Sequence, residues 1–482
     1  MRNAMNFGTV IPTRRWALRV GVILVAAYGT LVGITAYDDQ RTRREWADAC
    51  AEADRLDPGW RWDELLAALP AVPDGRNSAE YVASAARLTP AVANTTGLKI
   101  ANVEVGIKKT PPCRRLSAQV TAAVQKLLAD AAPALSEADR IADCPAGRIT
   151  LPGSPVVQGN VPAGYDFLTV ARSLLYPRLV LRVEQGDADA ALDDVRLIVS
   201  VSRPLADCPT LLNNILAAAV RFHAVRGVER VLAQGEPSPA ALDATRRLLE
   251  AEAGRPLLLA AFRGERACLE DTLRALDDGR LTRDEVAWSM LLADPRQWTH
   301  WPPADRWLNR LTGRDLRRAK AVALVRHHTR VIEWLKESPD GLTAHDAEWA
   351  ALRAGMTGAA KVMADYLSRY VDDLRTHEAQ FRCAVAALAA ERFRRDTGRW
   401  PATLAELVPT YLTAVPSDPQ NLEPLRLAHR SDGIVIYSVG PDGADDGGAI
   451  ATDGAKKETD VGIRLWDVAR RRQPAGDAAA RP

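Results

Sequence analysis

The stretch VGVILVAAYGTLVGITAY, from Val20 to Tyr37, decides the architecture that we expect of this chain. Its eighteen residues include no charged side chain. A helix of that length would be about 27 Å long, which is enough to cross the hydrocarbon core of a bilayer. Trp16 and Tyr37 lie at its two ends, where aromatic rings favour the membrane–water interface. The sequence therefore predicts a membrane anchor that contacts lipid through residues 16–37.

The charges on the two sides of the anchor predict its orientation. Four arginines and no acid precede it, whereas three arginines mixed with acidic residues follow it: Arg2, Arg14, Arg15 and Arg19, then Arg41, Arg43 and Arg44. Because the more basic flank stays in the cytoplasm, this slight bias places the large domain on the periplasmic or extracellular side.

Two alternatives to an uncleaved anchor stay open. A cleaved secretory signal needs small residues at positions −3 and −1, but cleavage after Ala36 would place Ile34 at −3. The pair Arg14-Arg15 is by itself a weak cue for a twin-arginine signal. The other alternative is a buried helix of a soluble protein. The sequence favours the anchor over both.

Composition excludes one class of partner and limits the chemistry. The chain has 482 residues, enough for two or three domains, with 63 basic and 61 acidic side chains. Since phosphate binding needs a basic excess, nucleic acid is excluded as the main partner. The six cysteines form no Cys-x-x-Cys pair. Cys113 and Cys144 bracket an expected helical hairpin, so a disulfide there is an alternative to buried thiols.

Apolar residues at three- and four-residue steps predict helices through most of the chain. We expect helices on both sides of the turn DPGW (57–60), at 114–142, at Phe167–Glu184, Ala188–Arg203, Thr210–Ala233 and Ser238–Leu276, then at 316–337, 343–370 and Asp372–Thr397. Residues 90–112 are rich in Thr, Val and Asn, which predicts a loop with a short strand. The absence of a 34-residue period favours stacked helical hairpins over a tetratricopeptide array.

The expected fold is mainly α, with an N-terminal transmembrane helix, a stack of α-helical hairpins as ectodomain, and a small C-terminal α+β module. The predicted parts are a cytoplasmic tail and anchor (1–37), a membrane-proximal helical region (38–145), a helical domain (165–370), the C-terminal module (371–470) and a disordered tail (471–482). Trp288, Trp298, Trp301 and Trp307 predict an irregular loop packed over the helices, or alternatively an exposed surface for carbohydrate.

No catalytic group is evident in the sequence, which contains none of the common phosphate-binding, nucleophile or zinc-protease motifs. His327 and His328 are adjacent, so on a helix they would point about 100° apart and could not chelate one ion. Glu265, Glu270 and Asp271 would lie on one helix, where such charges are usually solvated or ion-paired. We therefore predict no catalytic residue.

The segment PDGADDGG, residues 441–448, supports a ligand hypothesis. Asp442, Asp445 and Asp446 crowd three carboxylates into a glycine-rich loop between expected strands at Gly433–Val439 and Val461–Trp466. A structural Ca²⁺ would relieve their repulsion, with Asp453 and Asp460 near enough to add ligands. The alternative is a solvated turn whose aspartates accept hydrogen bonds from backbone amides.

The order of motifs over residues 391–468 resembles the C-terminal module of type II secretion pseudopilins. These motifs are GRWP (398–401), a short leucine-rich helix, an Asp-Pro turn at 418–419, and YSVGPDG (437–443) followed by acids and glycines. The resemblance implies a calcium-stabilised sheet with Ser438, Asp442, Asp445 and Asp446 at the ligand positions. Pilus assembly is not implied, because Val20–Tyr37 lacks the glutamate that pseudopilins carry.

The whole chain is similar to a group of bacterial membrane-anchored proteins of uncharacterised function, which share the anchor, the DPGW turn and the YSVGPDGxDDGG ending. We therefore expect an outward-facing scaffold or binding protein of the cell envelope, without enzymatic activity, that binds a protein or another envelope component. The alternative is an envelope hydrolase whose residues meet only in the fold. A cavity with converging carboxylates or a His–Asp pair would favour the hydrolase.

Overall fold

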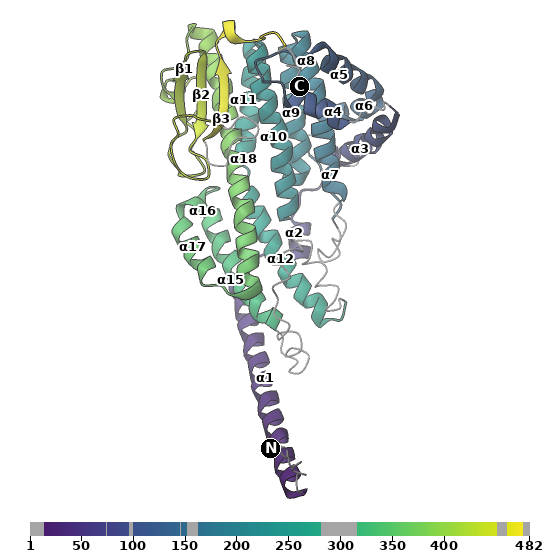
Figure 1. Ribbon diagram of the computed structural model, residues 1–482, viewed down its shortest axis with the longest axis vertical. Helices are drawn as coiled ribbons and strands as arrows, with labels where there is room; N and C mark the ends of the chain where they lie inside the picture. The colour runs from purple at the N-terminus through teal and green to yellow at the C-terminus, as the bar shows by residue number, and fades with distance from the viewer. Residues whose placement is uncertain are drawn as a thin grey trace, which may run out of the picture.

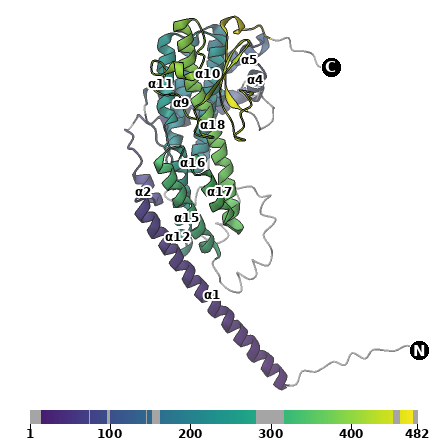
Figure 2. The same cartoon turned by 90° about the vertical axis from the view of Figure 1, so that its left-hand side faces the viewer.

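The computed structural model describes residues 14–73, 75–95, 100–144, 146–151, 162–280, 316–450 and 460–475. These residues form a mainly helical body, a three-stranded antiparallel sheet near the C-terminus and one long apolar N-terminal helix, as the sequence predicts. In Figure 1 the helices and the sheet form the upper part of the molecule, and α1 (Arg14–Leu56) extends below it. Figure 2 shows that the N-terminal half of α1 stands apart from the body.

Helix α1 has 43 residues and is long and apolar enough to cross a membrane, with none of its most apolar stretch buried inside the protein. Its second half packs against α15 (Leu316–Glu337), where Ala49 contacts the core residues Val322 and Val325. The helix ends before Pro58, and Gly59 takes a left-handed conformation with φ of 78°. The DPGW turn thus redirects the chain into α2 (Trp62–Ala67).

The larger part of the helical body follows α2. It contains α3 (Ser78–Thr95), α4 (Ile100–Lys108), α5 (Ala118–Asp130), α6 (Ala132–Asp139) with the 3-10 turn η1 (Arg140–Asp143), α7 (Pro162–Thr169), the π-helical turn η3 (Val170–Leu175), α8 (Tyr176–Gln185), α9 (Ala188–Ala206), α10 (Leu211–Gln234), α11 (Pro239–Ala253) and α12 (Leu257–Asp277). Ser117, Asp187, Thr210 and Ser238 begin helices by accepting a hydrogen bond from the amide three residues later. The expected helix at Ser238–Leu276 is divided in two, because Pro256 interrupts it.

The prediction of a loop with a strand at residues 90–112 is wrong. Helices α3 and α4 occupy most of this stretch, and Val103 and Ile107 on α4 are buried in the main core. Tertiary burial of one helical face has overridden the weak helix propensity of the β-branched residues.

The C-terminal part begins with α16 (Gly341–Ala344), α17 (Asp346–Ala354) and α18 (Gly358–Thr397), followed by η5 (Leu404–Leu407), β1 (Arg426–Arg430), β2 (Gly433–Ser438), β3 (Val461–Trp466) and η6 (Val468–Arg470). Helix α18 ends as predicted at Gly398, which has φ of 77°. The strands pair in the order β1-β2-β3. Gly433 pairs with both Arg430 and Trp466, and a Cβ there would lie 2.0 Å from the Leu465 carbonyl oxygen.

Two large apolar cores, beside the smaller cluster at Ala49, fill the part of the body that the structure describes. The main core joins Val82, Val220, Phe381 and Ile436, so the hairpin helices and the sheet pack together. A second core, which includes Trp334, lies among α12, α15 and the first half of α18. Helices α10 and α18 contribute to both cores. The expected boundary between residues 370 and 371 falls inside α18.

The prediction that the disordered tail begins at residue 471 is wrong, because residues 471–473 are held by the body. Arg471 is buried and binds Glu391 through Nη1 at 3.0 Å and Nη2 at 2.8 Å. The Gln473 amide donates to the Cys113 carbonyl at 2.8 Å.

Residues 476–482 and the tryptophans at 288–307 lie outside the described residues. All six cysteines, Cys113 and Cys144 included, are free thiols.

Candidate functional site

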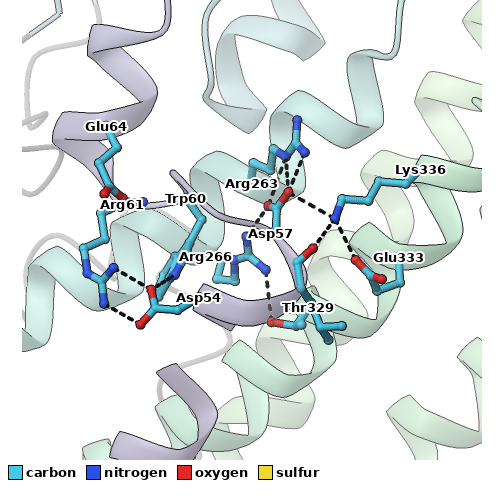
Figure 3. Close-up of polar contacts among 11 residues, drawn as sticks. Asp54, Asp57, Trp60, Arg61, Glu64, Arg263, Arg266, Thr329, Glu333 and Lys336 are labelled. Carbon is cyan, nitrogen blue, oxygen red and sulfur yellow. Dashed lines mark hydrogen bonds and ion pairs between the residues drawn. The ribbon is translucent and has the colours of Figure 1, made fainter. Parts of the chain in front are cut away.

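The DPGW turn places a buried carboxylate where α1 meets the body. Asp57 is 3% exposed and accepts hydrogen bonds from Arg263 Nε at 3.0 and 3.1 Å and from Arg266 Nη2, both on α12. Lys336 of α15 forms an ion pair with it at 3.3 Å. Figure 3 shows these three cations converging on the Asp57 side chain from two helices. One carboxylate therefore joins the end of α1 to α12 and α15.

Further contacts fix each member of this junction. Arg266 lies over the Trp60 ring, 4.8 Å from its centroid, and donates to Thr329 Oγ1 at 3.1 Å. Lys336 also donates to the Leu56 carbonyl oxygen at 2.6 Å, which satisfies a free carbonyl at the end of α1. These contacts hold the turn and both helices in one arrangement.

Electrostatics keeps Asp57 ionised in this position. Burial alone would raise its pKa, but the hydrogen bond from Arg263 and the charges of Arg263, Arg266 and Lys336 hold the pKa below its usual value. Asp54, one turn earlier, is more exposed; the hydrogen bond from Arg61 lowers its pKa despite some burial. The Asp57 carboxylate is therefore charged and fully paired at neutral pH.

The aspartates of the predicted calcium loop are bound by local groups. Asp445 accepts hydrogen bonds from the Tyr437 hydroxyl at 3.0 Å and the Gly447 amide at 2.9 Å, and pairs with Arg426 Nε at 3.1 Å. Asp442 accepts from the Ala444 amide at 3.1 Å. This arrangement corresponds to the alternative in which aspartates cap backbone amides.

The remaining predicted ligands are not all brought to that loop. Ser438 is buried and donates to Asp418 Oδ1 at 2.7 Å, so it binds the Asp-Pro turn. The backbone amides of Asp446 and Gly448 donate hydrogen bonds to the Asp460 carboxylate, at 3.4 and 2.6 Å. Asp453 lies outside the described residues. Among the residues that the structure describes, no three or more His, Cys, Asp or Glu side chains are grouped as metal ligands would be.

A cavity of about 50 Å³ lies inside the body, between α10, the α11–α12 connection, α16 and α18. Its charged lining comprises Arg221, Arg255, Arg375, Arg382, Asp340 and Glu378. Arg382 binds both carboxylates, with Nη1 and Nη2 at 2.8 and 2.9 Å from Asp340 and Nε at 2.9 Å from Glu378. Burial raises the pKa of Glu378, although Arg382 and Arg221 oppose this effect. No sequence signal indicated this cavity, because its residues come from distant segments.

The structure places the two adjacent histidines and two of the helix acids considered in the sequence at buried or half-buried positions. Trp349 Nε1 donates to His327 Nε2 at 3.1 Å, and His328 Nδ1 lies 2.5 Å from the Leu324 carbonyl oxygen. Burial lowers the pKa of His327 to about 3 and that of His328 to about 4, so both are neutral core residues. Asp271 is buried and pairs with Arg274 at 3.0 Å. Burial raises the pKa of Glu265 to about 7.

No family model, no curated protein and no solved structure matches the chain. The resemblance of residues 391–468 to pseudopilins therefore stays a prediction.

Proposed function

We propose that the chain is a membrane-anchored scaffold or binding protein whose helical body faces the periplasm or the cell exterior. The exposed apolar side chains of α1 support the anchor. Ile23 is 65% exposed, Val25 73% and Tyr28 62%. A continuous apolar surface of this kind is unfavourable in water and favourable in lipid.

The Asp57 junction is the observation that carries the proposal of a scaffold. Residues 38–56 continue the same helix beyond the apolar segment and add about 28 Å of length at 1.5 Å per residue. The helix then enters the body through a buried ion-pair cluster instead of a flexible linker. Such a connection would hold the body at one distance and one tilt from the bilayer, which is what presentation of a binding surface requires.

The hydrolase alternative is less well supported by the cavity. Its two lining carboxylates, Asp340 and Glu378, converge on Arg382 and each accepts a hydrogen bond from it. A general acid or base must be able to reach a substrate proton, and carboxylates engaged by one guanidinium are poorly placed for that. A binding site, by contrast, could use these residues while Asp340 and Glu378 keep their hydrogen bonds to Arg382.

We also propose a structural Ca²⁺ at the acidic loop, although local groups already satisfy part of it. Asp442, Asp445 and Asp446 are all exposed, so their carboxylates are open to an ion from solvent. Ca²⁺ accepts the irregular geometry of such loops. The ion would have to displace the pairing of Arg426 with Asp445.

Membrane fractionation with a topology reporter tests the anchor and its orientation. A phosphatase that is active only outside the cytoplasm is fused after Ala475, and the membranes are washed with alkaline carbonate. We expect an active fusion of full length that stays in the pellet. Release by carbonate, loss of the N-terminal segment, or an inactive fusion would each contradict the proposal. A matched fusion carrying Val25→Arg and Val32→Arg should lose membrane retention.

A further inference from the structure

We propose that the cavity of the helical body binds a small anion, a carboxylate or a phosphate carried on an apolar stem. The inference rests on the proposed binding role but is independent of the membrane anchor. It assigns a ligand class to residues that come from four separate segments of the chain.

The cavity lies where the two apolar cores meet. Ala218, Leu342 and Leu374 of its lining belong to the second core, whereas Phe381 belongs to the main core. One buried water needs roughly 10–15 Å³ measured in this way, so about 50 Å³ leaves space for a group of several heavy atoms. The side chain of Arg255 is 31% exposed, which gives the cavity an edge at the protein surface.

Hydrogen-bond donors on the lining exceed what the described partners use. A guanidinium carries five N–H groups. Arg255 donates through Nη1 to Asp207 at 2.9 Å and pairs through Nε with Glu252 at 3.2 Å. Arg375 binds Asp346 through Nη1 and Nη2, and its buried Nε has no hydrogen-bond partner in the part of the chain that the structure describes. Donors therefore remain available to a ligand that brings oxygen acceptors.

Three of the four carboxylate oxygens on the lining are already engaged. Both carboxylate oxygens of Asp340 receive hydrogen bonds from Arg382, and Glu378 Oε1 receives one from the same guanidinium. The lining holds four arginines and two carboxylates, and each arginine is already paired with at least one carboxylate. Because these charges are balanced, an anion would bind through the guanidinium N–H groups that the pairs leave without a partner.

The rest of the lining predicts the other part of the ligand. Leu257, Leu258, Leu342, Leu374 and Phe381 cover the sides of the cavity that carry no charge. Because these side chains offer no hydrogen bond, a purely inorganic ion would leave them in contact with water. A short hydrocarbon stem attached to the anionic group fits both parts of the lining.

The test uses the full chain in detergent and follows its melting temperature during titration with butyrate, with butyl phosphate and with sodium chloride at equal ionic strength. Binding of one site gives a saturable rise in melting temperature, unlike general salt effects. We expect a saturable rise with butyrate or butyl phosphate and none with chloride. The anion that acts at the lower concentration identifies the preferred class.

Two variants decide whether the cavity is the site. Arg255→Gln removes a partly exposed guanidinium and should raise the concentration of anion at half-saturation about tenfold or more, measured from its own baseline stability. Arg369→Gln, an exposed arginine of α18 outside the lining, should change nothing. Equal shifts for all three salts, or a saturable shift that Arg255→Gln leaves unaltered, would overturn the inference. Either outcome leaves the membrane test unaffected.

Discussion

The turn at residues 57–60 and the loop at residues 441–448 both combine aspartate with proline and glycine, yet their carboxylates have different surroundings. Asp57 is buried, and its partners lie more than 200 residues away in sequence, on α12 and α15. Asp445 is exposed, and its partners lie within 20 residues. Burial and distant partners, more than the number of acids in a segment, therefore decide how strongly an aspartate stabilises the fold.

The largest effect is expected from Asp57→Ala. Removal of the carboxylate leaves Arg263, Arg266 and Lys336 facing one another, and loss of one partner from a buried ion pair costs about 3–5 kcal/mol. Denaturant unfolding of the full chain in detergent measures the change. Asp54→Ala, one turn earlier in α1 and with a side chain that is 45% exposed, serves as the control and should cost about 1 kcal/mol or less. Equal losses in the two variants would remove the distinction between the regions.

Acid should weaken the same junction. Since the pKa of Asp57 is lowered in the folded chain, its stabilising contribution is present above the unfolded value of about 3.9 and is lost as pH falls through the folded value. The difference in unfolding free energy between the native chain and Asp57→Asn should be constant from pH 5 to 7 and shrink below about pH 4. A difference in unfolding free energy that grows as pH falls would mean that the pKa of Asp57 is raised, not lowered, in the folded chain.

An intermediate effect is expected from Asp418→Ala. Asp418 is fully buried and accepts hydrogen bonds from the Ser438 hydroxyl at 2.7 Å and the Val439 amide at 3.0 Å. Buried donors left without an acceptor cost about 1–3 kcal/mol. The loss measured by denaturant unfolding should lie between those of Asp57→Ala and Asp445→Ala. If Asp418→Ala costs as little as the loss of an exposed acid, the burial of an aspartate does not by itself determine how much it stabilises the fold.

A smaller effect is expected from Asp445→Ala without added metal. Its carboxylate is 46% exposed and pairs with the partly exposed Arg426. Surface pairs of this kind contribute less than about 1 kcal/mol. A loss above 2 kcal/mol would place this loop in the same class as the DPGW turn.

Calcium provides the finest test of the comparison. If the loop binds the ion, 1 mM Ca²⁺ should raise the melting temperature of the full chain by about 1 °C, as a stabilisation of roughly 1 kcal/mol would do. The double change Asp445→Asn and Asp446→Asn should abolish that rise, whereas 1 mM Mg²⁺ should not reproduce it. An unchanged melting temperature would leave the aspartates as caps of backbone amides.

Local patterns predicted much of the fold. The strand Val461–Trp466 was predictable from the alternation of its side chains. The end of α18 was predictable from Gly398, because glycine takes the left-handed conformation at little cost. Both signals lie within the segment itself. Residues 90–112 were misassigned because β-branched residues lie on a buried helical face. The mean propensity of a segment does not contain that information.

The sites depend on contacts that sequence patterns do not encode. The DPGW turn was recognisable as a break between helices, but nothing near Asp57 indicates that Arg263, Arg266 and Lys336 surround it. The cavity likewise combines Arg221, Arg255 and Asp340 only after α10, α12 and α16 have packed. Arg471 was assigned to the tail because its partner, Glu391, lies 80 residues away.

The most direct test of the rigid anchor is a distance distribution between spin labels in lipid nanodiscs. Labelled non-natural amino acids are introduced at Gln40 on α1 and Glu337 at the end of α15, both exposed positions. We predict one narrow distribution for the native chain and a broader one for Asp57→Ala, because the ion pairs at Asp57 join the two helices. A broad distribution in the native chain, or equal widths with and without Asp57, would contradict the proposal of a rigid junction.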